Sequence, residues 1–130
     1  MSLAAIRGYV QGVFDSHRDE ILCNRNYRRT LLTDAANKRQ IVLMTLRHNE
    51  DIPSEMHTDT TQYLHVVQGL MYVSMNAEPR HYHPGQGAFV QPGTRHYVAN
   101  GSPDKEPLII LSYYSPPHWP EDYRSYRQRP

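Results

Sequence analysis

The chain has 130 residues, a length that fits one domain with a single core. Its formal net charge is +1, so bulk charge gives no support for a nucleic-acid-binding or membrane-binding surface. Ten prolines and seven glycines predict many turns and few long helices, and no apolar run approaches the roughly 20 residues of a transmembrane helix.

The N-terminal segment, residues 1–25, is expected to form an arm or a short helix. Ile6, Val10 and Val13 recur at near-helical spacing, whereas two glycines in the same stretch weaken a helix. The pattern leaves open whether this segment is a helix of its own or an arm that packs on a partner.

The single cysteine, Cys23, excludes an intrachain disulfide, so the fold does not depend on an oxidising compartment. No histidine or aspartate lies beside it in the sequence, and we interpret it as a small buried hydrophobic residue rather than a nucleophile. The N-terminus also lacks the charged and apolar pattern of a secretion signal, so a cytoplasmic protein is expected.

Residues 26–117 are expected to form a barrel of short strands. Residues 39–46 are apolar on both faces, which predicts a strand that is covered on both sides. Residues 48–53 are expected to be a loop, and residues 118–130 a tail that lies over the barrel or is mobile. The expected strands are 27–33, 39–46, 54–57, 63–67, 70–75, 80–83, 88–91, 95–99 and 108–114. Because no long helices alternate with them, the sequence predicts an all-β sandwich or barrel.

The candidate functional residues begin with Glu55-Met-His57. Residues i and i+2 of a strand share a face, which places a carboxylate and an imidazole in one interior. A turn at 58–61 brings Gln62 to the same interior, and His96 follows a Pro-Gly turn on a later strand. Glu55, His57 and His96 then form a set with open positions that suits Fe(II), Mn(II), Ni(II), Zn(II) or Cu(II). Gln62 is either a weak fourth ligand or a group that holds a bound water.

These residues fall into two spaced motifs that resemble those of the cupin superfamily. The family's first motif reads Gly, five residues, His-x-His, three or four residues, Glu, six residues, Gly, and here it runs Asn49, Glu55, His57, Gln62 and Gly69. The second reads Gly, five residues, Pro-x-Gly, two residues, His, three residues, Asn, and here it runs Gly85, Gln91, Gly93, His96 and Asn100. Glu55 stands where the family motif has its first His, and Gln62 stands where it has Glu. The motif therefore keeps one carboxylate, but at a different position. The three motif glycines are interpreted as turn residues with positive φ.

The chain is similar to small single-domain cupins that are described as RmlC-like or mannose-6-phosphate-isomerase-like. That resemblance implies an all-β, double-stranded β-helix, or jelly-roll barrel, with a short N-terminal segment. It implies a metal-dependent enzyme, of dioxygenase or isomerase type, that acts on a small oxygenated molecule in the barrel. Glu55 would be a ligand or a general base. The alternative left open is a non-catalytic protein that binds a small molecule or sugar without metal turnover.

The expected partners are a small-molecule substrate or ligand and a second copy of the chain. Cupins commonly form dimers through barrel edges, so a homodimer is expected, with the N-terminal segment contributing. No pair of DNA-binding helices is visible in the sequence, so no nucleic-acid partner is expected. No membrane partner is expected either.

The remaining histidines are interpreted as structural or solvated. His81 and His83 form a second i, i+2 pair, which is expected to face solvent in a hairpin. His65 is expected to pack on the strand face opposite Gln62. His48 and His118 are expected to be solvated in loops.

The aromatic residues at the end of the last expected strand and just after it are interpreted as core and barrel-closing side chains rather than substrate contacts: Tyr113, Tyr114 and Trp119. Three arginines are interpreted as solvated charges: Arg28, Arg29 and Arg39. A role in holding an anionic substrate is left open for an arginine near the barrel mouth.

Overall fold

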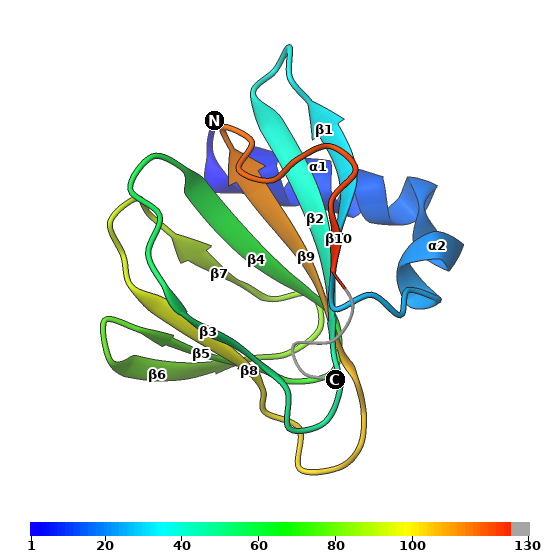
Figure 1. The fold of residues 1–130 in the computed structure, drawn as a ribbon, viewed down its shortest axis with the longest axis vertical. Coiled ribbons are helices and arrows are strands. Elements are labelled where there is room, and N and C mark those ends of the chain that lie inside the picture. The colour runs from blue at the N-terminus through cyan, green and yellow to red at the C-terminus, as the bar shows by residue number, and fades with distance from the viewer. Residues whose placement is uncertain (126–130) are drawn as a thin grey trace.

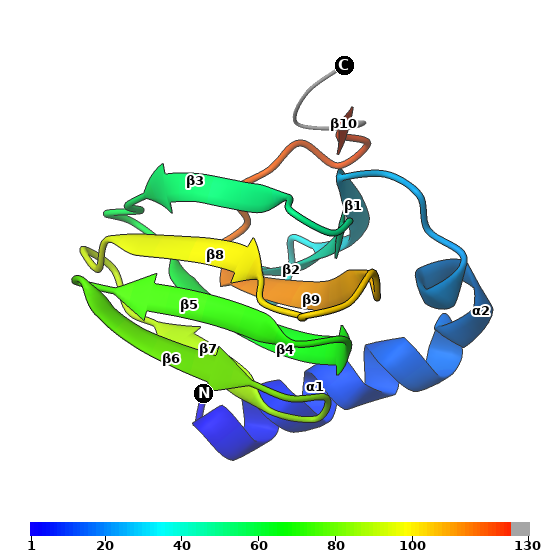
Figure 2. The same cartoon turned by 90° about the horizontal axis from the view of Figure 1, so that it is seen from below.

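The computed structural model describes residues 1–125, in which two helices precede two antiparallel sheets (Figure 1). The helices are α1 (Leu3–Ser16) and α2 (Arg18–Leu22). The six-stranded sheet has the order β10-β1-β2-β9-β4-β7, with bounds Arg124–Ser125, Arg28–Asp34, Arg39–Leu46, Leu108–Ser115, Thr61–Gln68 and Gly87–Val90. The four-stranded sheet has the order β3-β8-β5-β6, with bounds Asp51–Glu55, His96–Asn100, Met71–Met75 and Glu78–Tyr82. The two sheets face each other as the halves of a jelly roll, as expected (Figure 2).

The main core lies between the two sheets. Alternate residues of β2, β4 and β9 point into it, because successive side chains of a strand face opposite sides. Its members include Val42, Met44, Leu64, Val66 and Ile110, all at most 1% exposed. This packing explains why these segments were recognisable as strands from their apolar residues.

A second apolar cluster covers the outer face of the larger sheet. Figure 2 shows α1 lying along this face. Ile6, Val10 and Val13 of α1 are buried there with Leu43, Tyr63 and other outer residues of the sheet. Strand β2 is therefore buried on both faces, as predicted. Within residues 1–125, neither helix has the length and apolar character needed to cross a membrane.

The N-terminal segment is helical, which resolves the choice left open by its sequence. The Ser2 hydroxyl accepts a hydrogen bond from the Ala5 amide at 3.1 Å and so caps the first turn. The interpretation of Cys23 as buried is wrong. Cys23 is exposed where α2 ends, because the apolar contacts of this helix are made by Ile21 instead.

The prediction of a loop at 48–53 is wrong in its second half. Strand β3 begins at Asp51 and includes Pro53. Proline is tolerated here because β3 is an edge strand that pairs only with β8, and the pairing is irregular between Ile52 and Glu55. The strand also ends at Glu55, so the predicted strand 54–57 is wrong at its end.

The chain after the last long strand packs against the barrel in its described part. Tyr123 accepts a hydrogen bond from the Thr30 amide at 2.9 Å through its carbonyl, and β10 pairs with the start of β1. The part of the predicted tail at 126–130 lies outside the described residues.

Candidate metal centre

Three of the sequence-predicted ligands converge at one point. The ligand atoms of Glu55, His57 and His96 all lie within 4.8 Å of one another. The Oε1 atom of Glu55 is 3.4 Å from Nε2 of His57 and 3.8 Å from Nε2 of His96. The two histidine side chains are 8% and 1% exposed, whereas that of Glu55 is 28% exposed. The cluster therefore has a buried imidazole side and a carboxylate side that meets solvent.

Backbone pairing fixes the positions of all three side chains. Glu55 lies directly opposite His96 in the β3–β8 register. The Gly93 amide donates a hydrogen bond to the carbonyl of His57 at 2.8 Å. Gly93 adopts φ +85°, a conformation that glycine permits in the turn before His96. His57 lies beyond the end of β3, but the in–out alternation continues through the exposed Met56, so its ring still meets Glu55.

The tautomer of His96 is determined by its surroundings. Nδ1 lies 2.9 Å from the carbonyl oxygen of Thr94, and a carbonyl only accepts, so Nδ1 carries the proton. In a neutral ring this leaves the Nε2 lone pair facing the carboxylate of Glu55. Among the described residues, neither Nε2 of His96 nor Nε2 of His57 has a hydrogen-bond partner. Two buried imidazole nitrogens beside a carboxylate fit a divalent metal ion, which would be bound by all three groups.

The carboxyl group of Glu55 is held in its charged form. Burial alone would raise its pKa, but when Nε2 of His57 and Nε2 of His96 carry protons, their hydrogen bonds to the carboxylate, together with the charge of Arg28, lower it well below its usual value. The ionised carboxylate is the form that binds a metal ion.

Gln62 is buried close to this cluster on β4. Its Nε2 donates to the hydroxyls of Ser112 at 2.9 Å and Tyr114 at 3.0 Å. The ring of Tyr114 is 6.1 Å from that of His57. The amide oxygen of Gln62 is buried without a hydrogen-bond partner among the described residues. Its role as a fourth ligand, or as the holder of a water, stays a prediction.

His118 lies beside the cluster, a position that no motif in the sequence indicated. Its ring centroid lies 4.3 Å from that of His57, and its ring stacks on Tyr114 at 5.7 Å. Burial of the ring and the charge of His57 lower the pKa of His118. His118 is exposed in a loop, as expected, but the loop after β9 also places its ring against those of His57 and Tyr114.

A buried glutamine holds that loop in place. Gln40 of β2 accepts hydrogen bonds from the amides of His118 at 3.1 Å and Trp119 at 2.9 Å. Its Nε2 donates to the carbonyl of Trp119 at 2.7 Å. Two threonine hydroxyls bind the loop ends, Thr60 at the carbonyl of Pro116 and Thr30 at the carbonyl of Pro120. The rings of residues 118 and 119 are thus fixed by contacts from distant strands.

The other histidine predictions largely hold. His65 is buried on the outer face of β4, opposite Gln62, within 3.1 Å of the Tyr63 hydroxyl. His81 and His83 are exposed on and beside β6. His48 is exposed in a loop.

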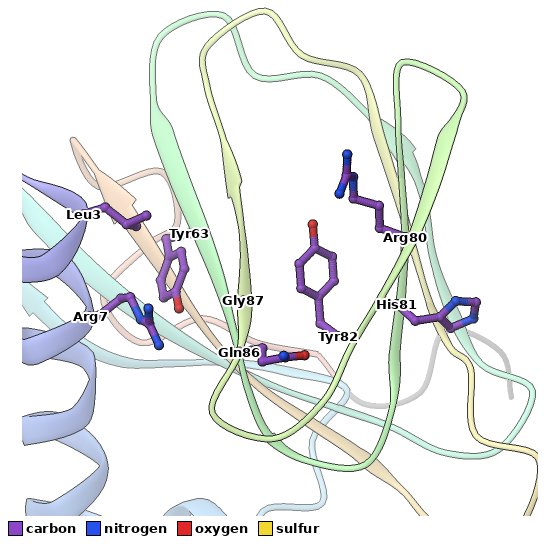
Figure 3. A pocket seen from close by; sticks show the side chains of 8 residues that line it. All are labelled: Leu3, Arg7, Tyr63, Arg80, His81, Tyr82, Gln86 and Gly87. Carbon is purple, nitrogen blue, oxygen red and sulfur yellow. The ribbon is translucent and has the colours of Figure 1, made fainter.

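A hollow of about 630 Å³ lies away from the predicted ligands, beside α1. Figure 3 shows Arg7 and Tyr63 on one side of it and Arg80 and Tyr82 on the other. None of the three clustered ligands lines this hollow. The hollow is therefore separate from the clustered ligands.

Comparison with known proteins identifies a matching family and two similar sequences. Residues 42–114, more than half of the chain, match the family pattern described as "Cupin domain". An uncharacterized protein of Acanthamoeba polyphaga mimivirus is 32% identical over 106 residues, which cover 79% of this chain and 64% of the relative. An uncharacterized protein of Bacillus subtilis, YrkC, is 32% identical over 103 residues, which cover 75% of this chain and 53% of the relative. The chain thus spans less than two thirds of the length of either relative.

A crystal structure of a Bacillus halodurans protein has a similar fold. It is 30% identical to this chain, with a TM-score of 0.74. The match covers 82% of this chain and 83% of that protein. The similarity therefore includes most of the barrel described above.

Proposed function

The chain belongs to the cupin domain family, and from this premise we propose that it is a metal-dependent enzyme acting on a small oxygenated molecule in the barrel. The observation that carries the proposal is the pair of buried, unpartnered histidine nitrogens that face the Glu55 carboxylate. A structural core does not need such an arrangement, because buried polar groups are ordinarily hydrogen-bonded.

Glu55, His57 and His96 would hold the ion, with Gln62 as a weak fourth ligand or as the holder of a bound water. The donor set of two imidazoles and one carboxylate suits Fe, Mn, Ni, Zn or Cu in the divalent state. When bound, the ion would supply Lewis acidity or a site for O₂ or a chelating oxygenated substrate. Three protein ligands leave coordination positions open for such a molecule.

The lowered pKa of Glu55 supports its role as a ligand over its role as a general base. A catalytic base works best when its pKa is near the operating pH. The Glu55 carboxylate, whose pKa is held well below its usual value by His57, His96 and Arg28 despite its burial, is a weak base. Its partial exposure places it on the side from which a ligand would approach.

We expect the purified protein to hold close to one equivalent of a divalent transition metal. Glu55→Gln removes the one negative ligand while keeping the shape of the side chain. We expect metal affinity to fall by at least about 10–100-fold, a loss that is seen even for groups behind the ligands. Elemental analysis after dialysis, followed by metal titration, measures both quantities.

The matched control for this variant is Glu78→Gln, because Glu78 is an exposed carboxylate on β6 that pairs with Arg80. Metal content should be unchanged by it. Wild-type metal affinity in Glu55→Gln would contradict the proposed centre. Once the metal is identified, O₂ uptake separates dioxygenase chemistry from isomerisation. A protein that retains its metal but turns over no candidate substrate would favour the non-catalytic alternative.

The homodimer is likewise proposed, and two exposed apolar residues at the start of the chain support it: Met1 is 73% exposed and Leu3 is 45% exposed. We expect sedimentation at micromolar concentration to give the mass of two chains, and a monomeric mass would contradict this.

Two further proposals concern the location and the partners of the protein. The single cysteine supports a cytoplasmic location, and the formal net charge of +1 supports the absence of a nucleic-acid partner.

A further inference from the structure

Arg28 lies on the inner face of β1, near the candidate metal centre. It is paired in register with Met44, a buried residue of the main core, and opposed residues of an antiparallel pair share a face. Its guanidinium carbon lies 4.3 Å from the ring centroid of Trp119 and 5.5 Å from that of Tyr27. The two rings hold the guanidinium by cation–π interaction. The interpretation of Arg28 as a solvated charge is therefore wrong.

Within residues 1–125, Arg28 differs from two other arginines of the sheet because it forms no ion pair. Arg29 pairs with Glu20, and Arg39 pairs with Asp34. Among residues 1–125, no carboxylate forms an ion pair with Arg28, and its buried Nε has no hydrogen-bond partner. A half-buried guanidinium with unused donors is unfavourable unless an acceptor reaches it.

The position of Arg28 connects it to the ligands through two aromatic rings. The ring of Trp119, which Arg28 contacts, is 5.2 Å from that of His118, and His118 is 4.3 Å from His57.

The charges of the site are unbalanced once a metal is bound. A divalent ion held by one carboxylate and two neutral imidazoles leaves one positive charge, and Arg28 adds another. A small anion that reached both groups would satisfy the free donors of the guanidinium and the open positions of the centre. A planar guanidinium matches a carboxylate, with which it forms paired, charge-assisted hydrogen bonds.

We propose that Arg28 binds a carboxylate of the substrate, whose other end reaches the metal, so that the substrate is a small carboxylate with a second oxygenated group. The proposal rests on the proposed metal-dependent function. It names Arg28 as the residue that selects a molecule with a carboxylate at the end away from the metal over one that lacks this group. Trp119 would hold the guanidinium in place for this contact.

Two probes separate the contact at Arg28 from binding at the metal. L-malate and L-lactate share a 2-hydroxy acid end that can chelate a metal, but only malate has a second carboxylate. We expect the metal-loaded protein to bind malate about tenfold more tightly than lactate, the contribution of about one charge-assisted hydrogen bond. Calorimetry measures both affinities. Trp119 is the only tryptophan of the chain, so its fluorescence reports directly on binding at Arg28.

Arg28→Met keeps the length and the packing of the stem but removes the donors. We expect it to reduce the preference for malate to less than about twofold and to abolish the malate-dependent change in Trp119 fluorescence, with lactate affinity and metal content unchanged. Arg28→Lys should retain part of the preference, because it keeps the charge without the planar fork. The matched control is Arg39→Met, since Arg39 also lies over an aromatic ring, Tyr9, at 3.9 Å, but on the outer face.

An unchanged malate preference in Arg28→Met would overturn the proposal. Equal affinity of the wild-type protein for the two probes, including binding of neither, would also overturn it. The proposed metal centre and the proposed anion contact can each be contradicted without the other. Absence of metal from the wild-type protein contradicts the centre, whereas the Arg28-dependent preference for malate is also measured on metal-free protein and reports on the arginine alone.

Discussion

Replacing His96 by alanine is expected to abolish tight metal binding. His96 is 1% exposed, and its Nδ1–H donates to the carbonyl of Thr94, so its Nε2 is presented to the centre without freedom to turn away. Its removal leaves Glu55 and His57 as the only charged or imidazole ligands of the cluster. We expect a loss of at least about 100-fold in affinity, beyond that of a change behind the ligands. Elemental analysis and competition with a chelator of known affinity measure it.

The control must separate loss of a ligand from loss of a buried side chain. His65→Ala serves this purpose, because His65 is also buried on a strand and its ring is hydrogen-bonded, but it faces the outer side of the sheet. Both variants should lower the melting temperature through the space they leave, and only His96→Ala should lose metal. Retention of full metal content in a folded His96→Ala protein would contradict the proposed centre.

The second large effect is expected for Gln40→Leu. Gln40 is fully buried, and its side chain makes four hydrogen bonds: to the amides of His118 and Trp119, the carbonyl of Trp119 and the hydroxyl of Thr33. Leucine fills a similar volume but leaves these backbone groups without partners. We expect the free energy of unfolding to fall by about 2–4 kcal/mol. Denaturant titration measures this change.

The same variant should also release the loop that carries His118 and Trp119. Trp119 fluorescence should then shift toward that of a solvated indole before global unfolding begins. Gln11→Leu is the control, since Gln11 is an exposed residue of α1 whose one hydrogen bond is to Asp15. A stability loss in Gln40→Leu no larger than that in Gln11→Leu would contradict the role of Gln40 in holding the loop.

Much of the site could be predicted because its residues are encoded locally. The i, i+2 spacing of Glu55 and His57 gives a shared direction without any tertiary information. His96 was identified by its place after the Pro-Gly turn, and the structure pairs it directly with Glu55. The predicted strand ran to residue 57, whereas β3 ends at Glu55. The side chain of His57 nevertheless lies beside that of Glu55, as predicted.

His118 and Arg28 could not be predicted, because their positions depend on contacts between distant segments. His118 is placed by Gln40 and Thr60, far earlier in the chain. Arg28 looked like a neighbour of Arg29, yet the β1–β2 register turns it inward while Arg29 pairs with Glu20. A charged side chain at a strand start gives no local sign of which face it takes.

The strands of the fold were predictable where apolar residues alternate or are continuous, as in β2, β4 and β9. The failure at β3 has a physical cause. This edge strand is held by one neighbour only and contains Pro53, so its residues resemble a loop in composition. The N-terminal helix was ambiguous because its stability comes from the sheet face that it covers rather than from its own residues.

The pairing of Glu55 with His96, and the bond from the Gly93 amide to the His57 carbonyl, have a consequence for folding. The proposed ligands come from residues 55–57 and from the distant His96, and they meet only when β3 has joined β8. An unfolded chain has no such site, so an ion that binds there binds the native state and raises its share of the population by mass action. Long-range pairings of this kind form late and slow the folding of β proteins. Metal supply would therefore influence how much of the newly made chain stays folded.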